Sequence, residues 1–200
     1  MLIQRIKNFF TAKPYKPYEP YNAIDVARFI VNYANDNDML VSPYKLNYIL
    51  YFVQLTFLQE KHKLCFKDKL IATSYGLTCE AIDKEFTSWK SFSIPYIKEY
   101  WDLSDGLWNA KKVPWVNNIN YEDQETIIDV VRTCDDYSFS NLAYIVKHQY
   151  PYMHCYNRFK KDNTITIDAM KHFVNMCDNP DENNQNDWYC KMDYLEEKRT

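Results

Sequence analysis

Histidine and cysteine side chains gather in the C-terminal part of the sequence, where they could hold a metal ion or form a nucleophilic pair. Zinc sites typically use such ligands as Cys-x-x-Cys, or as two histidines four residues apart on a helix. The sequence has neither pattern, and it has no Gly-x-Ser-x-Gly nucleophile elbow. One enzyme alternative stays open, a hydrolase that uses His148 with Cys155 or with zinc. The other residues of these types are His154, His172 and Cys177.

Glycine is scarce in this chain, and its scarcity argues against several ligand-binding folds. The 200 residues include 2 glycines, where an average usage of ~7% would give about 14. A Gly-rich phosphate loop, a Rossmann fingerprint and a series of tight hairpins all need more glycine than this. Nucleotide-binding α/β folds and most all-β folds are therefore disfavoured.

Charge and hydropathy place the chain among globular proteins. The formal net charge is −3, whereas a dedicated nucleic-acid binder usually has a strongly basic face. No stretch approaches the ~18 apolar residues of a membrane span, and no secretory signal precedes the six cysteines. We therefore expect a cytoplasmic protein with reduced thiols, with no membrane partner and no nucleic-acid partner.

Apolar residues recur at helical spacing through the middle of the chain, which predicts a mainly α domain. Capping residues mark where the helices start, and proline at a first helical position supports the second start. The expected fold is a compact domain of about six helices with a minor short-strand element at residues 70–75. The expected helix caps or first residues are Asn22, Ser42, Glu80, Asn120, Ser138 or Ser140, and Thr166.

Three finer expectations concern the ends of these elements. The third helix is expected to run to Trp89 with that side chain inward, and the fifth to stop at Pro151. Residues 91–118 are expected to be irregular, with aromatic side chains that either close the core or contact a partner. These aromatic residues are Tyr96, Tyr100, Trp101, Trp108 and Trp115.

Composition divides the chain into three parts. Residues 1–20 form a basic amphipathic segment with a Pro-rich linker, which could dock on its own domain or touch a membrane surface. Residues 21–177 form the helical domain. Residues 178–200 are an acidic, Asn-rich tail with seven acidic and three basic residues. This tail could fold back on the core or act as a free recognition motif.

Three stretches of the helical domain resemble a known family. Lys-Leu-Asn-Tyr-Ile-Leu-Tyr-Phe at 45–52 is similar to a helix of the Panacea domain, the SocA-like antitoxin domain also found in phage-associated proteins. Ala-Thr-Ser-Tyr-Gly-Leu-Thr at 72–78 resembles the family's Ala-Trp-x-Tyr-Gly-Pro-Val. Residues 140–152 resemble its His-x-x-x-Pro-Trp element. The resemblance covers about residues 22–175, and the chain departs from the pattern at Thr73, Leu77, Thr78 and Tyr152.

The resemblance implies a non-enzymatic, protein-binding inhibitor without a cofactor or a small-molecule substrate. Panacea antitoxins typically neutralise a toxin encoded beside them, by direct complex formation or by delivering the toxin to a protease. The departures leave a second hypothesis open, in which a phage or mobile element encodes the chain to inhibit a host defence protein such as a CRISPR effector or a nuclease.

The expected partner-binding residues come from the resembling motifs and from the aromatic segment, because interfaces use aromatic anchors. Two of them also have structural explanations. Gly76 could serve a turn with positive φ, and His148 could cap the last carbonyls of its helix. The full set is Tyr75, Gly76, Leu77, Trp101, Trp108, His148 and Tyr152.

Overall fold

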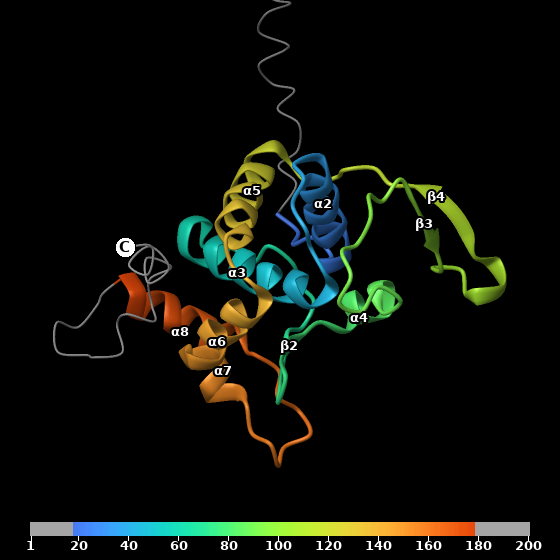
Figure 1. Ribbon diagram of the computed structural model, residues 1–200. Helices are drawn as coiled ribbons and strands as arrows, with labels where there is room; N and C mark the ends of the chain where they lie inside the picture. The colour runs from blue at the N-terminus through green and yellow to red at the C-terminus, as the bar shows by residue number, and fades with distance from the viewer. Residues whose placement is uncertain (1–17, 179–200) are drawn as a thin grey trace, which may run out of the picture.

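Helix α3 (Pro43–Lys61) is the central element of the domain, and the other helices pack around it (Figure 1). The computed structural model describes residues 18–178, and all statements below concern this range. Within it the chain forms seven α-helices and two small antiparallel hairpins, so the predicted mainly α fold is confirmed. The other helices are α2 (Ala23–Asp36), α4 (Glu80–Phe86), α5 (Tyr121–Asp135), α6 (Phe139–His148), α7 (Tyr150–Cys155) and α8 (Ile167–Asp178).

Local signals explain where most of these helices begin. The Ser42 side chain accepts a hydrogen bond from the Lys45 backbone N–H at 3.3 Å, and Asn120 caps α5 in the same way through Asp123 N–H at 2.9 Å. The Thr166 hydroxyl accepts from Ala169 N–H at 3.1 Å at the start of α8. Each cap satisfies a backbone donor that the first turn leaves without a helical partner. These predicted starts are confirmed.

Strands β1 (Ile71–Thr73) and β2 (Gly76–Thr78) form the first hairpin, which the sequence predicted as a single strand. The outer edge of β1 is covered by the loop before α8. Ala72 N–H donates to the Asn163 carbonyl at 2.9 Å, and Ile165 N–H donates to the Leu70 carbonyl at 2.8 Å. The hairpin is therefore joined to a segment some 90 residues further along the chain.

Strands β3 (Glu99–Asp102) and β4 (Lys111–Pro114) form the second hairpin, and their tip contains a 3₁₀ turn at Leu107–Asn109. Figure 1 shows this hairpin set off to one side of the helices. The expectation of an irregular segment over 91–118 was therefore wrong for these strands. Each strand has only four residues, which is too short for a clear alternation of apolar and polar side chains. The turn between the strands sets their pairing instead.

Two helix ends also differ from expectation. Helix α4 ends at Phe86, and Trp89 lies beyond it with 38% of its surface exposed. Helix α6 ends at His148, and Pro151 lies in the first turn of a separate short helix, α7. Proline is well tolerated there, because first-turn N–H groups have no helical acceptor.

The two predicted extensions lie almost wholly outside the described residues. The basic amphipathic helix and most of its linker fall in residues 1–17, and the acidic tail beyond Asp178 falls in residues 179–200. Among the described helices, none combines the length and the apolar character needed to cross a membrane.

Candidate partner-binding surface

The three stretches that resemble the Panacea domain meet at the β1–β2 hairpin. Tyr48 of α3 is 4% exposed and lies against Gly76 of β2. From the other side, the Tyr152 hydroxyl of α7 donates to the Thr73 carbonyl at 2.5 Å. The packing of α3, α6 and α7 therefore fixes the position of the turn between β1 and β2.

Within this junction, only part of the predicted set faces solvent. Tyr75 lies at the tip of the hairpin and is 91% exposed, whereas Leu77 and Tyr152 are 7% and 5% exposed. Burial raises the pKa of Tyr152 to about 12. Gly76 has φ +140°, as the turn explanation expected, and it is buried. The side chains of Leu77 and Tyr152 are thus used inside the domain, and Tyr75 is the accessible member.

His148 lies at the C-terminal end of α6. Its Nδ1 is 2.7 Å from the Tyr144 carbonyl, and its ring centroid is 4.2 Å from that of Tyr144. Tyr144 lies one turn back in the helix, so this contact does not involve the last carbonyls that the cap explanation named.

Trp101 and Trp108 lie far from this junction, on the β3–β4 hairpin (Figure 1). Trp101 is 56% exposed and Trp108 is 100% exposed, beside Leu103 at 49% and Leu107 at 78%. We call these four residues the hairpin patch. The predicted partner-binding residues therefore form two separate groups.

The inner face of the hairpin is attached to α2 by Arg28, a residue that the sequence did not single out. Arg28 is 5% exposed, and its guanidinium lies 3.5 Å from the centroid of the Tyr100 ring. It also pairs with Glu85 at 2.9 Å. Next to it, the Asn32 side chain hydrogen-bonds both backbone groups of Ile97, at 2.6 and 2.9 Å. Tyr100 is half-buried here, so its role is structural.

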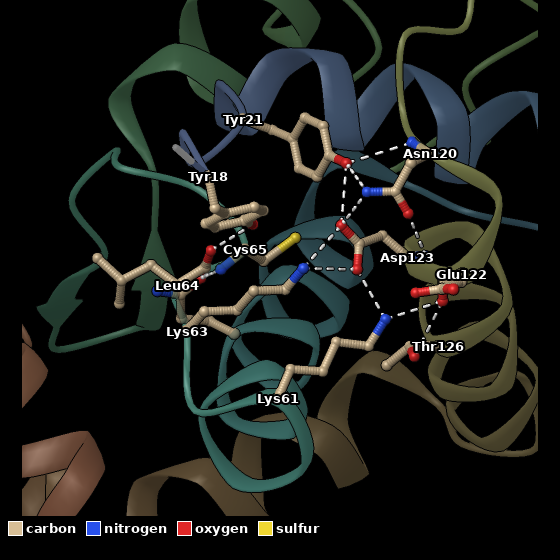
Figure 2. Close-up of polar contacts among 11 residues, drawn as sticks. Tyr18, Tyr21, Lys61, Lys63, Leu64, Cys65, Asn120, Glu122, Asp123 and Thr126 are labelled. Atoms are coloured by element: carbon tan, nitrogen blue, oxygen red, sulfur yellow. Dashed lines mark hydrogen bonds and ion pairs between the residues drawn. The ribbon is translucent and has the colours of Figure 1, made fainter. Parts of the chain in front are cut away.

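A buried ionic cluster around Asp123 forms the most extensive polar network among the described residues (Figure 2). Asp123 is 1% exposed, and its carboxylate accepts from Lys61 at 2.7 Å and from Lys63 at 3.0 Å. The Tyr21 hydroxyl and the Asn120 amide donate to its other oxygen at 2.9 and 2.7 Å. The cluster joins the start of the domain, the end of α3 and the start of α5.

The electrostatics of this cluster agree with a structural role. Burial alone would raise the pKa of Asp123, but hydrogen bonds from Lys61, Lys63, Tyr21 and Asn120 outweigh it and lower the pKa. Burial raises the pKa of Tyr21 to about 12. Four donors thus keep the carboxylate ionised. This is expected of a group that holds elements of the fold together, and not of a group that transfers a proton. The only sequence signal for it was the cap formed by Asn120, because its lysines lie about 60 residues away.

The histidine and cysteine residues considered for a metal site do not converge. His154 stacks on Tyr150 with ring centroids 5.0 Å apart, and the His172 ring lies tilted against the same tyrosine at 4.7 Å. Across the described part of the chain, no three His, Cys, Asp or Glu side chains come together as metal ligands.

Comparisons with known proteins gave no match. No protein-family model matches the chain, and neither the curated proteins nor the solved structures gave a match to it. The resemblance to the Panacea domain therefore stays a prediction that rests on the sequence motifs alone.

Proposed function

We propose that this chain is a non-enzymatic inhibitor that neutralises a partner protein by direct complex formation. The observation that carries the proposal is the hairpin patch, in which two tryptophans and two leucines stand exposed on a hairpin outside the helical core. Trp108 contributes nothing to the packing of its own domain, because its side chain is fully exposed.

The composition of the patch is typical of a binding surface. Tryptophan is enriched among the residues that dominate binding energy, and such anchors are usually surrounded by polar groups. Here the surrounding charges come from both strands, with Glu99 paired to Lys112, and Asp105 lying 4.0 Å from Lys111. An apolar centre with a charged rim supports recognition of a protein surface.

The resemblance to Panacea antitoxins favours a toxin as the partner. The motifs that carry this resemblance include the hairpin with Tyr75, so a toxin could contact this second accessible site as well. A host defence protein would be recognised through the same patch. The identity of the captured protein therefore distinguishes a toxin from a host defence protein as the partner.

The test is capture of the partner from the native host by the tagged full-length chain, followed by quantitative mass spectrometry. Trp108→Ala is compared with wild type and with Phe92→Ala, a matched control that removes an aromatic ring 72% exposed in the segment after α4. We expect one stoichiometric protein to be captured by wild type and the control and to be lost, by at least tenfold, with Trp108→Ala.

The captured protein is then produced with and without this chain. If the proposal is right, the partner's toxicity or nuclease activity is suppressed by wild type and is restored with Trp108→Ala. Equal capture by all three forms, or capture without inhibition, would contradict it.

A further inference from the structure

A groove with an excess of positive charge lies between the β1–β2 hairpin and the loop that joins α7 to α8. Figure 1 shows the two segments side by side at one end of the domain. The groove has a volume of about 590 Å³. It is lined by the residues of β1 and by Ser74, Tyr156, Arg158, Lys161 and Asn163.

No carboxylate lines this groove, and its cations lack acidic partners. Within residues 18–178, neither Arg158 nor Lys161, the two cations that line the groove, forms a salt bridge. The nearby carboxylate of Asp162 accepts hydrogen bonds from the backbone N–H and the hydroxyl of Thr164 at 2.9 and 2.6 Å. These bonds and the charge of Lys69 lower its pKa. This local excess of positive charge contrasts with the net charge of −3 of the whole chain.

A third cation is held at the rim of the groove. Lys147 of α6 donates from Nζ to the Ser74 carbonyl at 3.0 Å, which keeps its charge beside the hairpin turn. Exposed aromatic rings lie next to the cations, Tyr75 at the turn and Phe159 in the loop, with the Arg158 guanidinium 5.2 Å from the Phe159 ring centroid. The site therefore offers positive charge, hydrogen-bond donors and apolar contact together.

We propose that this groove binds an acidic segment of the partner protein, with carboxylates against Arg158 and Lys161 and an apolar side chain against Tyr75 or Phe159. The inference rests on the proposed function, because it assigns the chemistry of the partner's segment. Guanidinium and ammonium groups donate charge-assisted hydrogen bonds to carboxylates. A short acidic peptide fits better than a nucleic acid, because a long polyanion would extend beyond the groove over a protein of net negative charge.

The test uses the full chain and a fluorescein-labelled twelve-residue peptide in which Asp and Glu alternate with Ser and Leu. Binding is measured by fluorescence anisotropy at several salt concentrations. Arg158→Glu/Lys161→Glu is compared with Lys90→Glu/Lys98→Glu, which makes the same change of charge at two exposed residues that do not line the groove. We expect at least tenfold weaker binding for the groove variant, a change within twofold for the control, and weaker binding as salt rises.

Three other ligands act as competitors in the same measurement. A peptide with Lys in place of Asp and Glu should not compete. A single-stranded DNA of twelve nucleotides that binds more tightly than the acidic peptide would overturn the proposal in favour of a nucleic-acid site. A synthetic peptide of residues 179–200 that binds more tightly would instead identify the chain's own acidic tail as the occupant.

The two proposals fail in different ways. If Trp108→Ala abolishes partner capture while the groove variant captures normally and the acidic peptide binds both double variants equally, only the groove proposal is wrong. If the acidic peptide binds through Arg158 and Lys161 but Trp108→Ala captures the partner normally, the role of the hairpin patch is wrong and the groove remains.

Discussion

Gly76 of β2 lies so close to the ring of Tyr48 in α3 that no side chain fits between them. A Cβ atom on Gly76 would overlap the tyrosine hydroxyl and lie 2.9 Å from Cζ, and the residue has φ +140°. This contact joins the hairpin to the central helix, so both the backbone conformation and the absence of a side chain are required at this position.

Replacing this glycine is expected to destabilise the domain. Gly76→Ala should lower the free energy of unfolding by about 2 kcal/mol or more, since it adds backbone strain and displaces a buried ring. Gly106→Ala is the matched control, because Gly106 also has positive φ but open space around it, so only the strain of ~1 kcal/mol applies. Urea denaturation measures both variants, and equal losses would contradict the packing explanation.

Removing the charge of Asp123 should weaken the joint between the start of the domain, α3 and α5. Asp123→Asn leaves two lysines without their shared carboxylate, and we expect a loss of about 2 to 4 kcal/mol at pH 7. Glu80→Gln, which breaks an exposed pair with Lys84 on α4, should have no measurable effect.

The same cluster should make stability depend on pH in the acidic range. Because the pKa of Asp123 is lower in the folded protein than in the unfolded chain, its contribution is complete above the unfolded pKa of ~3.9 and disappears as pH falls through the folded pKa. The difference in stability between wild type and Asp123→Asn should therefore shrink as pH is lowered below about 4. A difference that stays constant to pH 2 would show that the carboxylate charge is not responsible.

The hydrogen bond from Tyr152 to the Thr73 carbonyl should stabilise the hairpin rather than the whole core. Tyr152→Phe removes a donor from the carbonyl of half-buried Thr73, at a cost of about 1 kcal/mol. Faster amide hydrogen exchange is expected at β1 and β2, with little change in α5. Tyr75→Phe, which alters a hydroxyl on a side chain 91% exposed, should leave the exchange rates unchanged.

The cysteines should differ sharply in their reactivity toward iodoacetamide. Cys65, Cys79 and Cys134 are buried, and burial raises the pKa of each thiol, to about 12 for Cys134. Because the thiolate is the reactive form, these three should be modified only after unfolding, whereas the half-buried Cys155 should react in the native protein. Peptide mapping by mass spectrometry at pH 8 checks this, and labelling in denaturant is the control.

Most helices could be predicted because their signals are local. The caps at Ser42, Asn120 and Thr166 act within one turn, and the apolar stripe of α2, Ala23, Ala27, Ile30 and Ala34, is wholly buried. Helix α7 was missed because Pro151 is compatible both with the end of one helix and with the first turn of the next. Sequence spacing alone does not distinguish these uses.

The candidate sites could be predicted only in part. An aromatic residue must be exposed to be available to a partner. Trp101 and Trp108 are exposed, whereas Tyr100 and Trp115 are half-buried. The Asp123 cluster and the groove beside β1 depend on residues 60 to 102 positions apart. A local sequence pattern carries no information about contacts between residues so far apart, so these sites could be identified only from the structure.

The base of the β3–β4 hairpin has a consequence for how this protein could be altered by evolution or by design. Trp115 N–H donates to the Lys98 carbonyl at 2.9 Å, so the two ends of the hairpin lie next to each other. Provided that Tyr100 stays against Arg28, the residues beyond it in the hairpin could be exchanged for another sequence without changing the path of the helices. Substitutions in this hairpin could therefore change which partner protein is bound, while the helices keep the residues that determine their fold.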